Sequence, residues 1–421
     1  MPRRRVLIVV TLLTLSVVLG SRAQANPQFK DVDFPKTSGV QIPSVKFAPA
    51  VTYGSGGTYT DCVVVADFNG DGHPDLVVVN DGSSSVDVLI GNGNGTFRAA
   101  VSYYSGGYAN WVAVADVNGD GYLDLVVANT TSIAVLLGNG NGTFQAPISS
   151  STGGNFVAVA DVNGDGHPDL VVPIAAGPNA YQVSVLLGNG DGTFQAPANY
   201  NSGGWYGSSV VVTDVNGDGK PDLVVANLCE SEDDCDNGEV GILLGSGDGT
   251  FQAPYSYNSG GYYAQSVAVG DFNGDGRIDL AVSNSACLAN CIDGHGVVSL
   301  LLGNGNGTFQ AATTYDSGGR AAGSIAIADV NADGYLDVVV ANSCPMKACG
   351  NSILAALLGN GDGTLQSAVT FHAGGSYASS LVVADVNADG RPDAIVANGC
   401  NKGKKCASGV VGVLLNKTKS R

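Results

Sequence analysis

The sequence predicts an all-β fold assembled from several copies of one small antiparallel sheet. Three observations lead to this prediction. One acidic nine-residue phrase recurs seven times along the chain, and short β-branched segments flank each copy. The composition, with 61 glycines, 2 methionines and 13% charged residues, suits turns and short buried segments better than helices.

The acidic phrase defines the repeat. It starts at residues 67, 116, 161, 214, 271, 329 and 385, and it reads DFNGDGHPD in the first copy and DVNADGRPD in the last. Successive starts are 49, 45, 53, 57, 58 and 56 residues apart, so the loops within the unit vary in length. The chain is therefore an array of one supersecondary unit rather than a set of unrelated domains.

Each unit predicts four short strands. In the first unit these are residues 63–66, 76–79, 86–90 and 96–104, separated by turn-forming residues. The Asn-Gly and Asp-Gly pairs of GNGNGTF and GNGDGTF favour tight hairpins, because such turns need positive φ. One four-stranded meander cannot bury both faces alone, whereas seven packed radially cover one another. The expected fold is a seven-bladed β-propeller of four-stranded antiparallel blades.

The two ends of the chain predict how the ring closes. The last unit ends with the segment 410–415 and has no fourth strand of its own. Near the start, FAPAVTYGSGG at 47–57 matches FQAPYSYNSGG at 251–261, which is a fourth strand with its exit turn. We therefore expect the N-terminal strand to complete the last blade of a propeller that spans 47–415, with 416–421 as a C-terminal tail.

The first residues predict export. Three arginines at 3–5 precede an apolar run at 6–20, and small residues lead up to Ala25. This pattern indicates a signal peptide over 1–25, followed by an N-terminal extension over 26–46. The apolar run is about 15 residues, short of the roughly 20 that span a bilayer, so a retained membrane anchor is the weaker alternative. The expected location is secreted, extracellular or periplasmic.

The charge of the chain excludes some partners. The formal net charge is −18, and it becomes about −22 when the four arginines of the signal peptide are removed. Such a chain is not expected to bind nucleic acid or to insert into a membrane. The oligomeric state is not predicted by any feature of the sequence.

The acidic phrase is also the strongest chemical signal. Side-chain oxygens at positions 1, 3, 5 and 9, with a backbone carbonyl at position 7, can surround a hard cation, and glycine at position 6 permits the sharp turn. The loop begins like an EF-hand loop, but Asp at position 9 replaces the distant glutamate. We expect about seven structural Ca²⁺ ions, and the ligands would be Asp67, Asn69, Asp71, His73 and Asp75; Asp116, Asn118, Asp120, Tyr122 and Asp124; Asp161, Asn163, Asp165, His167 and Asp169; Asp214, Asn216, Asp218, Lys220 and Asp222; Asp271, Asn273, Asp275, Arg277 and Asp279; Asp329, Asn331, Asp333, Tyr335 and Asp337; and Asp385, Asn387, Asp389, Arg391 and Asp393.

Two alternatives to calcium remain. The loops could be solvated acidic turns, but three carboxylates within a few ångströms would repel one another without a counter-ion. Magnesium is less suitable, because it retains water and demands a tight octahedron.

These seven phrases resemble the FG-GAP/VCBS repeats of integrin α-subunit propellers and of many secreted microbial proteins. The resemblance covers residues 47–415. It implies a seven-bladed propeller with calcium between the first and second strands of each blade. Related folds include calcium-containing fungal lectins that bind sugars between blades. No ligand carries over, because members of the family bind many different partners.

Strand parity predicts where a ligand binds. The acidic loops and the GNGxGTF turns must lie on one face of the ring, so the other two connections share the opposite face. The inter-blade loops on that face are rich in aromatic residues, which suit sugar rings or a partner surface. The ligand-face candidates are Tyr59, Tyr108, Trp205, Tyr206, Tyr262, Tyr263 and Tyr377, with Trp111 and Phe156 nearby. The alternative is that many of them pack between adjacent blades.

The cysteines predict local disulfide bonds in the second connection of that face. Cys229–Cys235, Cys287–Cys291, Cys344–Cys349 and Cys400–Cys406 recur at the same place in the last four units. Metal binding through these pairs is the alternative. Cys62 is left over, either as a buried thiol or as an intermolecular link.

Three functions follow from these features. Carbohydrate binding and protein adhesion or scaffolding both use a rigid face with exposed aromatic residues, so an extracellular glycan or protein is the expected partner. No catalytic motif or organic cofactor site is recognised, and we expect no enzyme activity. The third possibility is a polysaccharide lyase or hydrolase whose site is assembled around the central channel.

Overall fold

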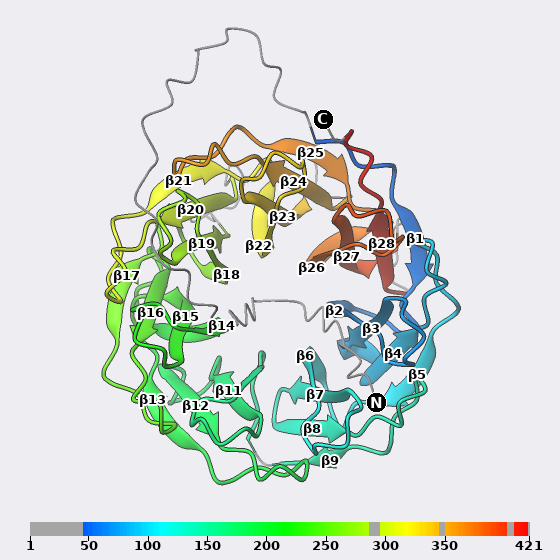
Figure 1. Ribbon diagram of the computed structural model, residues 1–421, viewed down its shortest axis with the longest axis horizontal. Coiled ribbons are helices and arrows are strands. Elements are labelled where there is room, and N and C mark those ends of the chain that lie inside the picture. Colours follow the sequence, from blue (N-terminus) through cyan, green and yellow to red (C-terminus); the bar gives the residue numbers. More distant parts are fainter. Residues whose placement is uncertain (1–44, 151, 286–294, 345–349, 402–407, 420–421) are drawn as a thin grey trace, which may run out of the picture.

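The computed structural model describes residues 45–419 except 151, 286–294, 345–349 and 402–407. Seven four-stranded antiparallel sheets are arranged in a ring, and the first strand of each sheet lies nearest the centre (Figure 1). The all-β, seven-bladed prediction is confirmed. Within the described residues the only helical element is the single 3₁₀ turn η1 (Asp81–Ser83).

The strands follow the repeat. Blade 1 contains β2 (Thr60–Ala66), β3 (Asp75–Asn80), β4 (Ser85–Leu89) and β5 (Val101–Tyr104); blade 2 contains β6 (Ala109–Ala115), β7 (Asp124–Asn129), β8 (Ser132–Leu136) and β9 (Ile148–Ser149); blade 3 contains β10 (Ala158–Ala160), β11 (Asp169–Pro173), β12 (Gln182–Leu186) and β13 (Ala198–Asn201). Blade 4 contains β14 (Trp205–Thr213), β15 (Asp222–Cys229), β16 (Glu239–Leu243) and β17 (Tyr255–Asn258); blade 5 contains β18 (Ala264–Gly270), β19 (Asp279–Asn284), β20 (Val297–Leu301) and β21 (Thr313–Asp316). Blade 6 contains β22 (Arg320–Ala328), β23 (Asp337–Cys344), β24 (Ile353–Leu357) and β25 (Val369–His372); blade 7 contains β26 (Ser376–Ala384), β27 (Asp393–Cys400), β28 (Val410–Leu414) and β1 (Val51–Gly54).

Blade 7 is completed by the N-terminal strand. β1 pairs antiparallel with β28, with Val51 opposite Val413, so the predicted closure of the ring is present. The contact continues beyond the predicted limits of the propeller, because the backbone N–H of Lys417 donates to the carbonyl of Lys46 at 2.7 Å. Thr418 is buried and accepts a hydrogen bond from the Lys46 backbone N–H at 2.9 Å.

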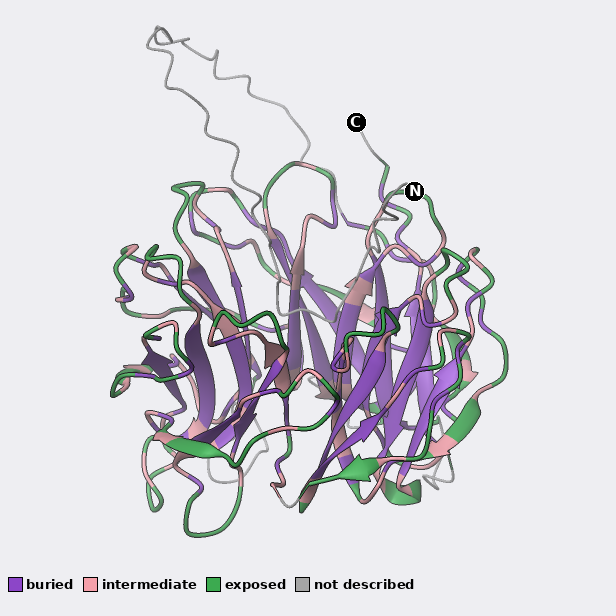
Figure 2. Ribbon diagram, turned by 60° about the horizontal axis from the view of Figure 1, so that its bottom comes forward, coloured by how far each residue is buried: buried purple, intermediate pink, exposed green. Residues whose placement is uncertain are grey.

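The hydrophobic core lies between adjacent blades. In one cluster, Val77 and Val79 of blade 1 are packed together with Val112 and Leu125 of blade 2. The inner three strands of a blade are largely buried, whereas the fourth strand is mostly exposed (Figure 2). Each sheet therefore buries both faces only through its neighbours, as the repeat predicted.

The fourth strand is shorter than the sequence suggested. It begins at Val101 in blade 1, not at residue 96. Residues 91–97 instead form a turn that is closed by a bridge between Gly91 and Phe97. The same bridge recurs in blades 2 to 6, and in blade 7 it joins Phe47 to Asn416.

Among the described residues, no helix is long and apolar enough to cross a membrane. The predicted signal peptide and most of the extension over 26–46 lie outside the described residues.

Candidate functional site: the acidic loops and the central hollow

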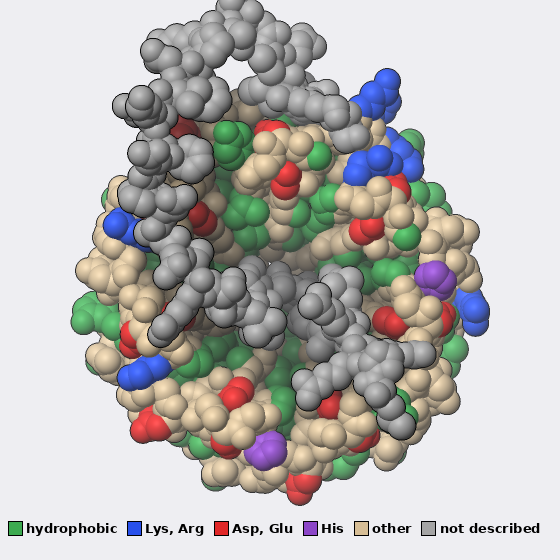
Figure 3. Space-filling view, viewed as in Figure 1, with side chains coloured by type: hydrophobic (Ala, Val, Ile, Leu, Met, Phe, Trp, Pro, Cys, Tyr) green, Lys and Arg blue, Asp and Glu red, His purple; other side chains and the backbone are tan. Residues whose placement is uncertain are grey.

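The acidic loops are held in shape by their own carboxylates. In blade 1, the Asp67 carboxylate accepts hydrogen bonds from the backbone N–H groups of Gly70 and Gly72, both at 2.8 Å. Asp71 likewise accepts from the N–H of His73 at 2.9 Å. Gly72 has φ +83°, which explains the glycine at position 6 of every phrase. In Figure 3, acidic side chains recur around the ring on the face that the view presents.

The aspartate at position 9 has a structural role that the sequence analysis did not predict. In all seven blades one carboxylate oxygen accepts from a backbone N–H of the turn after the third strand at 2.7–2.9 Å. The other oxygen accepts from the N–H of position 2 at 2.9–3.1 Å. These buried residues, which join two turns of one blade, are Asp75, Asp124, Asp169, Asp222, Asp279, Asp337 and Asp393.

Burial and neighbouring anions raise the pKa of these carboxyls. Desolvation is the largest cause and raises the pKa of Asp75 to about 6, against the two lowering hydrogen bonds. The anions of Asp71 and Asp67 raise it further. The pKa of Asp337 is raised to about 7 for the same reasons. Position-9 carboxylates therefore lie close enough to positions 1 and 5 to be repelled by them, which is the situation that a bound cation would relieve.

The donor set of the loops fits a hard cation. It consists of oxygen atoms, and in blade 7 the buried side-chain oxygen of Asn387 has no hydrogen-bond partner. In blade 2 the amide nitrogen of Asn118 lies 3.0 Å from Asp120, so rotating this amide would turn its oxygen toward the carboxylate cluster. As they stand, no three His, Cys, Asp or Glu side chains of the described residues are arranged to hold a metal ion. Their carboxylate oxygens accept hydrogen bonds from backbone N–H groups of the loop and keep further lone pairs that a cation could use.

The acidic face also joins neighbouring blades. The turn after the third strand of one blade donates a backbone hydrogen bond to position 2 of the preceding acidic phrase. Examples are Gly142 to Phe68 at 3.0 Å and Gly192 to Val117 at 3.0 Å. The two kinds of turn therefore share one face, as strand parity predicted.

The opposite face carries rigid inter-blade turns. A buried asparagine at the end of the second strand holds the turn that leads into the blade, as in Asn80 to the carbonyl of Ser55 at 3.1 Å and Asn342 to that of Ser317 at 3.0 Å. Five residues of these turns adopt left-handed φ between 52° and 60°, and they are Tyr59, Tyr206, Tyr263, Ala321 and Tyr377. Four of the seven predicted aromatic residues thus stand on a backbone conformation that few side chains adopt.

The predicted aromatic residues differ in exposure. Tyr59, Tyr108 and Tyr377 are exposed, whereas Trp205, Tyr206, Tyr262 and Tyr263 are half-buried. The Trp205 ring lies 5.3 Å from that of Tyr181, so packing between loops accounts for part of its burial.

A central hollow opens among these turns. It consists of two adjoining cavities of about 280 and 640 Å³ that share Asp61, Gln265, Gly323 and Ser379. The inner wall takes one residue from the same position of every blade, and we call this set the polar ring: Asp61, Asn110, Asn155, Ser208, Gln265, Gly323 and Ser379. A β-bulge in the first strand of most blades lies at this position, and bulges commonly redirect a side chain out of a sheet. The polar ring was not predicted from the sequence, because these residues belong to a segment whose pattern indicates only the start of a strand.

Among the described residues that line the hollow, Asp61 is the only one with a carboxyl group. Burial raises its pKa to about 7, and the anion of Asp81 contributes in the same direction. No described residue donates a hydrogen bond to its carboxylate.

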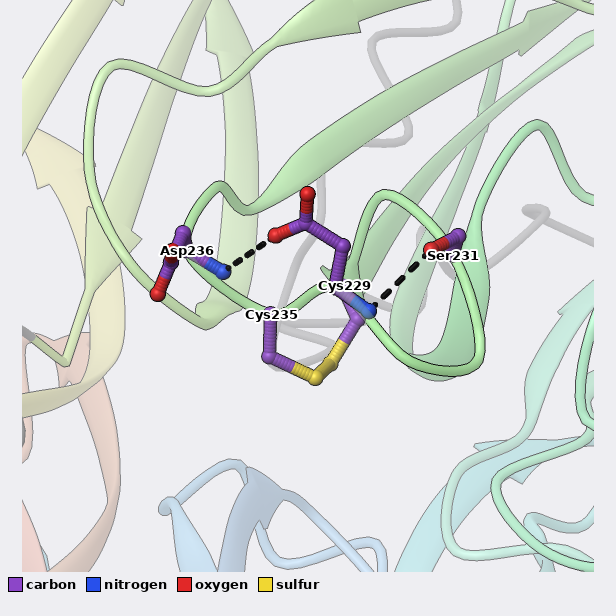
Figure 4. The surroundings of a disulfide bond; sticks show 5 residues. Cys229, Ser231, Cys235 and Asp236 are labelled. Carbon is purple, nitrogen blue, oxygen red and sulfur yellow. Dashed lines mark hydrogen bonds between the residues drawn. A yellow bond between two sulfur atoms is a disulfide. The ribbon is translucent and has the colours of Figure 1, made fainter.

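One of the four predicted disulfides lies wholly within the described residues. Cys229 and Cys235 are bridged at the end of β15, beside hydrogen bonds from Asp234 to Ser231 and from Asp236 to Asp234 (Figure 4). Each of the three other predicted pairs includes at least one cysteine outside the described residues, namely Cys287, Cys291, Cys349 and Cys406.

Cys62 is a buried free thiol. Burial raises its pKa to about 12, and the backbone N–H of Val112 in the next blade faces its sulfur. In other blades a serine makes the same inter-blade contact, as with Ser324 and the N–H of Leu381 at 3.1 Å. Cys62 therefore substitutes for a serine between blades and is not available for an intermolecular link.

The fold and its repeated loops define the class of protein as a repeat propeller. The FG-GAP-like repeat model matches residues 67–127, 116–172, 174–225, 227–282 and 287–340, well over half of the chain. The protein belongs to the FG-GAP-like repeat family.

Solved structures of other propellers are distantly similar. A lectin from Agrocybe aegerita, described as recognising non-reducing terminal N-acetylglucosamine, is 21% identical with a TM-score of 0.50, covering 77% of this chain and 90% of its own. BBS1N in complex with ARL6DN is 13% identical with a TM-score of 0.54, covering 88% and 98%. The V. cholerae biofilm matrix protein Bap1 is 14% identical with a TM-score of 0.49, covering 88% and 91%. No curated protein matches the chain.

Proposed function

We propose that the protein is a secreted, calcium-stabilised propeller that acts as a binding module, with its ligand on the face opposite the acidic loops. The observation that carries this proposal is the central hollow. One residue from each blade contributes to its wall, and aromatic residues on the inter-blade turns lie at its rim. Concave sites with a few convergent polar groups are the usual form of ligand sites.

Calcium has a structural role in this proposal. Each acidic loop offers oxygen ligands of the kind that Ca²⁺ prefers, and the seven loops repeat nearly the same hydrogen bonds. Burial and, secondarily, the neighbouring anions raise the pKa of the position-9 carboxyls, and a cation in each loop would offset the repulsion between these anions. Loops of such uniformity support the fold rather than distinguish between ligands.

Binding is favoured over catalysis by the chemistry of the hollow. Glycoside hydrolysis generally uses a pair of carboxyl groups flanking the scissile bond. The described lining of the hollow supplies one, Asp61. The ligand would be an extracellular glycan or protein. This fold is compatible with either class, because its distant likenesses include a lectin that recognises N-acetylglucosamine and a protein found in complex with another protein.

Secretion is supported by the bridge between Cys229 and Cys235, since such bonds persist in oxidising compartments. The predicted signal peptide over 1–25 would direct the chain to export.

The test is ligand capture by the mature chain, residues 26–421, on a glycan array and on a panel of purified extracellular matrix proteins. Substituting Tyr59→Ala with Tyr377→Ala at the rim of the hollow should weaken capture at least tenfold. Tyr104→Ala, which removes an equally exposed tyrosine from the outer strand β5, should leave it unchanged. Release of new reducing ends from a captured polysaccharide would contradict the binding role, as would equal losses in both variants.

A further inference from the structure

We propose that the central hollow binds a carbohydrate ring in the sector of blades 1 to 3, with Trp111, backed by the buried Phe156, as the apolar platform and Asp61, Asn110 and Asn155 as the polar contacts. The ligand class is a neutral or amine-bearing saccharide. This inference rests on the proposed binding function and names the ligand chemistry of the same face.

The platform arises at a position where other blades have serine. The residue that follows the polar ring is Ser209, Ser324 or Ser380 in blades 4, 6 and 7. Each of these hydroxyls accepts a backbone N–H of the next blade, from Val267 at 3.2 Å, Leu381 at 3.1 Å and Val63 at 3.4 Å respectively.

In blades 2 and 3 the same position holds aromatic rings instead. Trp111 and Phe156 lie 4.4 Å apart with an interplanar angle of 30°. Both line the smaller cavity. Phe156 is buried in the core between blades and supports Trp111, which is half-buried and supplies the accessible apolar surface. A sugar ring presents a face of C–H groups that packs on aromatic carbon, so this sector supplies an apolar platform that blades 4, 6 and 7 lack.

The polar ring has unused hydrogen-bonding capacity in the same sector. The hydroxyls of Ser208 and Ser379 donate to backbone carbonyls of the next blade, each at 2.7 Å, and so serve the inter-blade contact. By contrast, the side chains of Asp61 and Asn155 make no hydrogen bond to any described residue. Asn110 makes one, from its amide nitrogen to Thr130 at 3.3 Å.

These three polar side chains line the same cavity as Trp111 and Phe156, because Asp61, Asn110 and Asn155 are the polar-ring residues of three successive blades. A carboxylate and two amides can together donate to and accept from several hydroxyl groups. The smaller cavity, at about 280 Å³, is close to the lower end of the size range of small-molecule sites, about 300–1,000 Å³.

The charge of the cavity lining restricts the class of sugar further. The described lining contains no Lys, Arg or His, and its single carboxyl group is that of Asp61. Anionic sugars would meet a like charge without a compensating cation.

The experiment uses intrinsic fluorescence and calorimetry of the mature protein with calcium present. The chain has two tryptophans, so a sugar-dependent emission change that disappears in Trp111→Phe reports on Trp111. The probes are glucose, galactose, mannose, fucose, xylose, N-acetylglucosamine, N-acetylgalactosamine, glucosamine and their short oligomers, with glucuronic acid as the anionic counterpart. We expect saturable binding of at least one neutral or amino sugar, and at least tenfold weaker binding of glucuronic acid.

Two variants guard against simple loss of folding. Asp61→Asn and Asn110→Ala should each weaken binding of the same sugar at least threefold, with an unchanged circular dichroism spectrum. The matched control Tyr104→Ala should bind like the wild type.

The outcomes distinguish failure of the carbohydrate site from failure of the proposed binding function. Absence of binding by every probe would overturn the carbohydrate site, and capture of a purified matrix protein would then leave the binding module standing. An unchanged affinity for the sugar in both Asp61→Asn and Asn110→Ala would also overturn the site, because the sugar would be held elsewhere on the face. Failure to capture any glycan or protein would overturn both.

Discussion

The two faces of the ring differ in how closely they repeat from blade to blade. On the acidic face, one nine-residue loop is made seven times, and its position-9 aspartate joins two turns in every blade. On the other face, the polar ring holds Asp, Asn, Ser, Gln or Gly at equivalent positions. In a repeat protein, what each blade needs in order to fold recurs, whereas what a ligand needs can differ from blade to blade. The comparison assigns architecture to the acidic face and recognition to the other.

Removal of the N-terminal strand should have the largest effect on the fold. A chain that begins at residue 55 lacks β1, so the edge of β28 and its buried valines at 411 and 413 become exposed. We expect loss of the cooperative thermal transition or aggregation. A chain that begins at residue 45 keeps β1 and should melt as the mature protein does. Equal melting temperatures for the two chains would contradict the closure.

Asp222→Ala should be the most destabilising single substitution on the acidic face. It leaves the buried backbone N–H groups of Gly245 and Val215 without partners, at a cost of about 2–4 kcal/mol. The loss should persist in EGTA, because these hydrogen bonds do not involve metal. Asp248→Ala, in an exposed turn of the same blade, is the control for chemical denaturation. A loss of stability that appears in calcium and is absent in EGTA would show that the position-9 aspartate is a calcium ligand without a structural role.

Cys62→Ser should be nearly neutral, within about 1 kcal/mol, since serine makes this inter-blade contact in other blades. Cys62→Val keeps the volume and removes the acceptor for the Val112 N–H, so it should cost more. Urea denaturation of the two variants compares them directly, and the opposite order would refute the equivalence of the position.

Glu239→Gln should have the smallest effect and should depend on pH. Burial, and secondarily the Glu230 anion, raise the pKa of Glu239 to about 7 from its ordinary value of 4.5. The folded state therefore holds this proton more tightly, so the favourable contribution is present below pH 4.5 and is lost as the pH rises through 7. The variant should melt slightly above the wild type at pH 8 and close to it at pH 4.5. A higher melting temperature at pH 4.5 only would contradict the sign.

The fold was predictable because its signals are local and repeated. The seven acidic phrases, the turn glycines and the match between 47–57 and 251–261 determined the blade count and the closure. The polar ring was not predictable, since its position is set by β-bulges that leave no mark in the alternation of residues. The pairing of Trp111 with Phe156 likewise depends on how neighbouring blades pack. Position 9 was assigned only to calcium, because sequence spacing does not show which backbone N–H groups a carboxylate will meet.

The central claim is that the acidic face stabilises the fold through calcium while the opposite face binds the ligand. It is tested most directly by thermal unfolding of the mature protein in calcium and in excess EGTA, with bound calcium measured by atomic emission. The account predicts close to seven ions per chain and a large drop in melting temperature in EGTA. Little bound calcium with an unchanged melting temperature would contradict it, and the acidic loops would then become candidates for the ligand surface.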